Sequence, residues 1–165
     1  MGGWWAGKAR QFARHLTGRV TPDEWAAVAA WLSPTQLRLF EAMHPADQRH
    51  GLDVVAALRA AGHGGDPELL LAGLLHDASK GPTVGVWHRV AWSLGELLGS
   101  WVHRLAARLP GGGVAMARLR DHAERSAELA AAVGCPPRSV ALIRGDAGPG
   151  GGASLAALRA ADESS

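Results

Sequence analysis

The sequence predicts an all-α domain, and two observations support this prediction. No stretch alternates apolar and polar residues with the period of two that is typical of a half-buried strand. Helix starts, in contrast, are clearly marked. Thr21 is followed by Pro and, three positions on, by Glu24, which is the capping-box pattern; Ser33 and Gln36 repeat it. We therefore expect a bundle of about seven to nine helices.

Pro, Gly and Asp residues mark where the candidate helices begin and end. An amphipathic segment comes first, and the two capping boxes then open two short helices. Pro45 opens a longer helix, and Asp66 caps the most apolar one. The stretches LPGGGV and GDAGPGGG separate the later helices as flexible connectors. The candidate segments are residues 4–16, 22–32, 34–43, 45–62, 67–81, 84–98, 100–109, 113–133, 137–144 and 153–163.

Length and composition limit the domain organisation. A chain of 165 residues suits one domain with a substantial core. We expect residues 1–44 to form an N-terminal helical extension that packs on a core domain of residues 45–165, giving one compact unit. An exposed subset of the seven tryptophans would mark a homo-oligomer contact.

Charge and cysteine content exclude several classes of function. The formal net charge of the chain is +2, and the Arg residues are scattered along the sequence, so nucleic acid is not indicated as a partner. A single cysteine, Cys135, excludes an intramolecular disulfide and a zinc site made of thiolates. No secretory signal or apolar run of about 18 residues is present. We expect a cytoplasmic protein without a membrane partner.

The stretch LLLAGLLHDASKG places His76, Asp77 and Lys80 at the end of the most apolar run of the chain. A buried charge is costly unless it has a hydrogen-bonding partner or a metal ion. The spacing places His76 and Asp77 on the end of a buried helix, about 100° apart around its axis. Small residues at positions 72 and 73 would let another helix approach them closely.

Two more polar residues are predicted to point inward on other helices. His50 shares a helical face with apolar residues at positions 54, 57, 58 and 61. Asp162 ends a helix whose residues 155 and 158 are leucines on the same face. Two imidazoles and two carboxylates form a ligand set for one divalent ion, with Mn, Fe, Mg, Co, Ni and Zn all open. The simpler alternative is that these His and Asp side chains only hydrogen-bond to one another in a core without a metal ion.

This pattern resembles the HD-domain metal-dependent phosphohydrolases. A His, an adjacent His-Asp pair about 26 residues later and an Asp near the end of a late helix match His50, His76-Asp77 and Asp162. Lys80 lies where members with the pattern HDxxK carry a Lys. The resemblance implies an HD-like helical bundle in which these four residues bind the metal.

A second region resembles the HD subgroups with additional histidines, including the HD-GYP type. In LRDHAERSAELAAAVGCPPRSVALIR, His122 matches a His that holds a second metal or contacts the substrate in those relatives. Ser126 replaces their small Gly or Ala. No GYP motif follows, and Gly145-Asp146 stands where a pair of His is usual. Asp146 is thus either a substitute ligand or an exposed loop residue.

The resemblance implies a hydrolase that acts on a nucleotide or other phosphate ester through a metal-activated water. In this interpretation Asp77 and Lys80 are the catalytic residues, and Lys80 faces the negative charge of the phosphate. The partner is a phosphorylated small molecule or nucleotide. The alternative is a non-catalytic HD-type module that binds a nucleotide or a partner protein.

Overall fold

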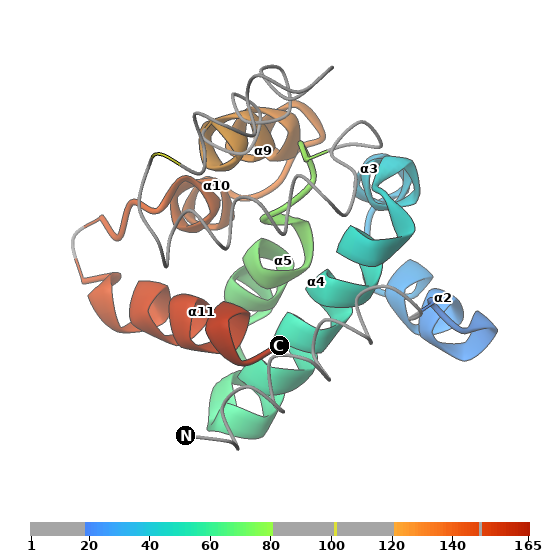
Figure 1. The fold of residues 1–165 in the computed structure, drawn as a ribbon, viewed down its shortest axis with the longest axis horizontal. Helices are drawn as coiled ribbons and strands as arrows, with labels where there is room; N and C mark the ends of the chain where they lie inside the picture. The colour runs from blue at the N-terminus through green and yellow to red at the C-terminus, as the bar shows by residue number, and fades with distance from the viewer. Residues whose placement is uncertain (1–18, 81–100, 102–120, 149) are drawn as a thin grey trace.

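The computed structural model describes residues 19–80, 101, 121–148 and 150–165. These ranges contain α-helices and one π-helical turn but no strand, which confirms the predicted all-α class (Figure 1). The segments expected at residues 4–16 and 84–98, with most of 100–109 and the start of 113–133, lie outside the described residues. None of the described helices combines the length and apolar character that crossing a membrane requires. The elements are α2 (Pro22–Ala29), α3 (Pro34–Ala42), α4 (Pro45–Leu58), the π-helical turn η1 (Arg59–His63), α5 (Pro67–Leu75), α9 (His122–Ala132), α10 (Pro137–Arg144) and α11 (Gly152–Ser164).

Both predicted capping boxes are present. The Thr21 hydroxyl accepts a hydrogen bond from the Glu24 backbone N–H at 3.3 Å, and the Glu24 carboxylate accepts one from the Thr21 N–H at 2.9 Å. Ser33 and Gln36 form the same reciprocal pair, at 3.3 and 3.0 Å. Each pair satisfies two backbone donors that a helix start would otherwise leave without a partner. The helices α2 and α3 therefore begin at the predicted prolines.

The end of α5 differs from its prediction. The apolar pattern predicted a helix to about residue 81, whereas α5 ends at Leu75 with His76 as its C-cap. Beyond it, Ala78 N–H donates to the Leu75 carbonyl at 3.0 Å and Lys80 N–H donates to the Asp77 carbonyl at 3.1 Å. These three-residue bonds form tight turns in place of an α-helix. His76 and Asp77 consequently lie in the turn that follows α5, and not on its last helical turn.

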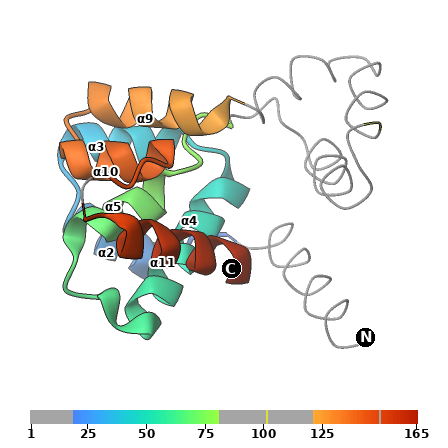
Figure 2. The same ribbon diagram turned by 90° about the vertical axis from the view of Figure 1, so that its left-hand side faces the viewer.

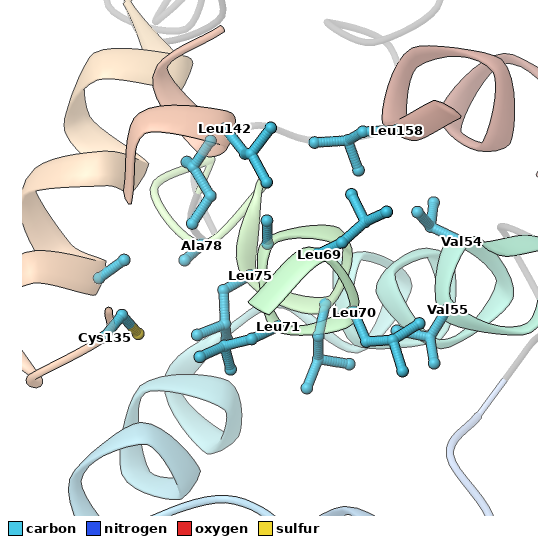
Figure 3. Packing of buried hydrophobic residues seen from close by; sticks show 14 of the residues in the cluster. Val54, Val55, Leu69, Leu70, Leu71, Leu75, Ala78, Cys135, Leu142 and Leu158 are labelled. Carbon is cyan, nitrogen blue, oxygen red and sulfur yellow. The ribbon is translucent and has the colours of Figure 1, made fainter. Parts of the chain in front are cut away.

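The hydrophobic core is built around α5. Every residue from 69 to 75 is buried, as expected of a helix that is apolar on all sides. Figures 1 and 2 show α4, α10 and α11 around α5, and Figure 3 shows its leucines between side chains of these helices. Val28 of α2 and Phe40 of α3 belong to the same buried cluster, and the ring of Trp25 packs edge-on against Phe40 at 5.2 Å. Residues 22–43 thus share one core with the helices that follow.

Two glycines allow α4 and α5 to pack closely. A Cβ atom at Gly51 of α4 would lie 2.5 Å from the Leu74 carbonyl oxygen, which is a backbone atom and cannot easily move. A Cβ atom at Gly73 of α5 would lie 2.9 Å from Leu58 Cδ1. The close helix approach predicted at position 73 is therefore confirmed. This close packing places His50, the residue before Gly51, beside the end of α5.

Candidate metal centre

His50 is the first side chain of the candidate centre. It lies on the buried face of α4 and is 7% exposed. Its Nε2 lies 2.7 Å from Oδ1 of Asp162, which projects from the last turns of α11. The contact joins residues 112 positions apart, because α11 packs against α4. The carboxylate of Asp162 remains about half exposed, so this side of the centre opens to solvent.

His76 is oriented by the backbone of α5. Its Nδ1 lies 2.9 Å from the Gly73 carbonyl oxygen, which can only accept, so Nδ1 carries the proton of this hydrogen bond. The other ring nitrogen, Nε2, then points at the two carboxylates, 3.3 Å from Asp162 Oδ1 and 3.6 Å from Asp77 Oδ2. The His50 and His76 rings meet edge-on, with their centroids 5.2 Å apart. A backbone carbonyl that fixes the ring in this way is typical of metal-binding histidines.

Asp77 is the most deeply buried ionisable group of the centre, with a side chain only 1% exposed. Its Oδ2 forms a short ion pair with Lys80 Nζ, one turn further along the chain. Its Oδ1 lies 3.7 Å from Nε2 of His122, the first residue of α9. The structure therefore places both Lys80 and His122 beside the carboxylate of Asp77, which the sequence pattern predicts to be a metal ligand and a catalytic group.

The geometry of these groups fits a divalent ion. One ligand atom from each of His50, His76 and Asp77 can be chosen so that all lie within 4.8 Å of one another. Ligands about 2.0–2.2 Å from one ion are separated by about 3–3.5 Å, close to the contacts measured around Asp162. His76 Nε2 and Asp77 Oδ1 are buried without a hydrogen-bond partner, and such atoms are costly unless a cation or proton meets them. The His50, His76 and Asp77 group could therefore hold a metal ion.

Opposite charges in the centre shift the pKa values strongly. Burial opposes the charged form of His76, but the carboxylates of Asp77 and Asp162 outweigh it and raise the pKa of His76 to about 9. Burial also opposes ionisation of Asp77, yet the nearby His76 and Lys80 hold its pKa well below the usual range. Burial is likewise outweighed at Asp162, where the hydrogen bond from His50 and the nearby imidazole of His76 lower the pKa. Without an ion, the His76 proton supplies the positive charge between the carboxylates.

This proton makes a testable prediction for the metal-free protein. Because the pKa of His76 is about 9 in the folded state and 6.5 ordinarily, its contribution to stability is complete below about pH 6.5 and is lost as the pH rises towards 9. We expect the free energy of unfolding to fall by roughly 2–3 kcal/mol across this interval. Urea unfolding with a chelator present, at a series of pH values, measures it. His76→Gln should abolish this pH-dependent fall in stability. His63→Gln, which changes a histidine outside the cluster, should show the same fall as the wild type. An unchanged pH dependence in His76→Gln would contradict the assignment.

One candidate from the sequence, Asp146, lies away from the centre. Asp146 is exposed after α10, where its Oδ1 accepts a hydrogen bond from the Gly148 N–H at 3.0 Å. It is not part of the His50, His76 and Asp77 group. Arg144, the last residue of α10, donates to both carboxylate oxygens of Glu124 at 3.0 and 2.9 Å on the surface. The described part of the chain thus supports His122, and not Asp146, as the additional residue beside Asp77.

Sequence reasoning missed one residue that shapes the centre. Gly51 follows His50 directly, and its missing side chain lets the backbone of α4 approach Leu74. The sequence did indicate a packing role for Gly51. A glycine in the middle of a helix costs about 1 kcal/mol of stability relative to Ala, so it usually occurs there because another element packs closely against it. Its partner helix could not be read from the sequence, because that contact is tertiary.

Comparisons of the chain with protein-family models, with curated proteins and with solved structures give no match. The residues of the centre and their geometry therefore carry the functional proposal.

Proposed function

We propose that the protein is a divalent-metal-dependent phosphohydrolase acting on a nucleotide or other phosphate ester. The observation that carries the proposal is the grouping of His50, His76 and Asp77, with the Asp162 carboxylate in contact with both imidazoles. These four residues come from α4, the turn after α5, and α11. Their likeness to the HD-domain pattern supports the reaction class.

In this proposal the two imidazoles and two carboxylates hold the ion. A bound divalent cation supplies a Lewis acid that lowers the pKa of water and offsets charge on phosphate oxygens. The Gly73 carbonyl keeps His76 Nε2 directed at the centre, and Lys80 forms an ion pair with Asp77. The half-exposed Asp162 and the partly exposed His122 leave a side from which a phosphate ester can approach.

Lys80 supplies a second positive charge in the same place. Its Nζ contacts Asp77 and its side chain is 19% exposed, so it can turn towards a phosphate at the open side. Negative charge develops on the non-bridging oxygens during phosphoryl transfer, and a nearby ammonium stabilises it. Lys80 therefore acts on the substrate, whereas the four ligands act on the ion.

Hydrolysis assays test the function itself. The protein is supplied with Mn, Fe, Co, Ni, Zn or Mg and assayed against an aryl phosphate, an aryl phosphodiester, nucleotides and cyclic nucleotides. We expect Asp162→Asn to abolish metal-dependent phosphate release. The same change in the exposed Asp146, Asp146→Asn, should leave it intact. Turnover that survives both a chelator and Asp162→Asn would contradict the proposal.

The role of Lys80 makes a separate prediction. Lys80→Gln should lower kcat by about a hundredfold, because it removes a charge that stabilises the transition state, and the variant should still bind metal. Arg144→Gln removes a surface cation already paired with Glu124 and should leave kcat unchanged. Steady-state kinetics with elemental analysis of each variant separates the effects. Equal kcat values for Lys80→Gln and the wild type would show that Lys80 does not face the phosphate.

The second candidate function is a non-catalytic module that binds a nucleotide or a partner protein. One observation favours it: Asp77 already contacts Lys80, and His50 is already hydrogen-bonded to Asp162, so much of the charge is balanced without an ion. Thermal stabilisation by nucleotides without product formation, in a protein with metal bound, would support this function over hydrolysis.

A further inference from the structure

The first turn of α9 is held against the candidate centre by two serines. His122 begins this helix, and its Nε2 lies 3.7 Å from Asp77 Oδ1. The N-cap residue, Asp121, forms no side-chain capping bond. The local sequence therefore provides little to fix the helix start, and contacts with the rest of the molecule must do so.

Ser126 and Ser79 supply such contacts through three hydrogen bonds. The fully buried Ser126 hydroxyl accepts from the Ser79 backbone N–H at 3.1 Å and donates to Ser79 Oγ, also at 3.1 Å. Ser79 Oγ in turn donates to the His122 carbonyl oxygen at 2.9 Å. Each hydroxyl proton is used once, and each bond joins the turn after α5 to α9 across more than 40 positions of sequence.

The location of these bonds connects them with the centre. Ser79 lies between Asp77 and Lys80 in the turn after α5, and Ser126 lies one helical turn beyond His122. The serine pair thus links the segment that carries the carboxylate and the ammonium to the segment that carries the imidazole. A Gly or Ala at position 126, as in the resembling HD subgroups, has no hydroxyl and could not make the two Ser126 bonds.

We propose that Ser126 and Ser79 are positioning residues that hold the His122 ring against Asp77. The inference rests on the proposed function only where it concerns turnover, because ring placement can be measured without any reaction. Losing either hydroxyl removes hydrogen bonds that join the start of α9 to the turn after α5, and the His122 ring then leaves its place beside Asp77.

The test uses Ser126→Ala and Ser79→Ala in the full chain, with Ser139→Ala as a matched control. Ser139 is also fully buried and its hydroxyl also donates to a backbone carbonyl, that of Glu68, at 2.9 Å. Ring proton signals of His122, assigned with His122→Gln, are recorded by NMR at one fixed pH in the metal-free protein. Metal affinity and steady-state kinetics are measured in parallel.

We expect Ser126→Ala and Ser79→Ala to shift the His122 ring signals and to lower kcat by about tenfold or more, with metal affinity much less affected. Ser139→Ala should lower the melting temperature without either change, and Ser79→Thr, which retains a hydroxyl, should restore both properties.

Unmoved His122 signals in both alanine variants would overturn the proposal. Shifted signals with an unchanged kcat in an active protein would also overturn it, because the serines would then not serve the reaction. If the wild type hydrolyses nothing, the proposed function fails while the ring signals still decide the positioning role. If Ser126→Ala does not fold, the comparison of Ser79→Ala with Ser79→Thr decides it.

Discussion

Gly51→Ala should destabilise the protein strongly. The new Cβ would lie 2.5 Å from the Leu74 carbonyl oxygen and 3.2 Å from its carbonyl carbon, so the backbones of α4 and α5 must move apart. Overpacking against backbone is not relieved by a rotamer change. We expect the free energy of unfolding to fall by about 3 kcal/mol.

The same substitution should weaken the candidate centre. Moving α4 away from α5 separates His50 from His76, whose rings are now 5.2 Å apart. Urea unfolding measures the loss of stability, and metal titration of the folded variant measures the second effect. Gly65→Ala is the matched control, because a Cβ there meets nothing within 4 Å. A Gly51→Ala variant with the urea midpoint of the wild type would show that the two helices do not pack as described.

Asp77→Asn should have the largest effect on metal binding. Its carboxylate is 1% exposed and lies beside His76, Lys80 and His122, so no water or neighbouring residue of the described chain can readily replace it. Residues that merely support a ligand weaken metal binding by about 10–100-fold when changed, so loss of the ligand itself should exceed about a hundredfold. The volume of Asn is nearly that of Asp, which keeps packing constant.

Calorimetric titration with Mn, Co or Zn measures this effect. Asp146→Asn makes the same chemical change at an exposed carboxylate that contacts only its own loop in the described structure, and should titrate like the wild type. Circular dichroism of each variant confirms that the helices persist. Equal affinities for Asp77→Asn and Asp146→Asn would remove Asp77 from the ligand set.

The helix starts could be read from the sequence because their causes are local. A Thr or Ser, a Pro and a Glu or Gln within four residues satisfy the backbone at one place, and both boxes form as predicted. The end of α5 could not be read in this way. The leucines continue the helical pattern up to His76. The chain nevertheless turns at His76, and this turn places His76 and Asp77 close to α4 and α11.

The candidate centre was partly predictable for a similar reason. Polar residues on apolar faces are detectable one helix at a time, which identified His50, His76, Asp77 and Asp162. Which of them meet depends on helix packing, and the helix that Gly51 packs against could not be read from the sequence. The sequence offered His122 as a match to a family histidine and left Asp146 as either a ligand or an exposed loop residue, and only His122 is carried to Asp77 by α9.

Metal content of the wild-type protein tests the central claim most directly. The protein is freed of metal with a chelator, dialysed against each of Mn, Fe, Co, Ni, Zn and Mg in turn, and analysed for bound ion per chain. The cluster of His50, His76, Asp77 and Asp162 predicts about one tightly held divalent ion per chain. A folded protein that retains none of these ions would contradict the account and leave the four side chains as a buried network of ion pairs.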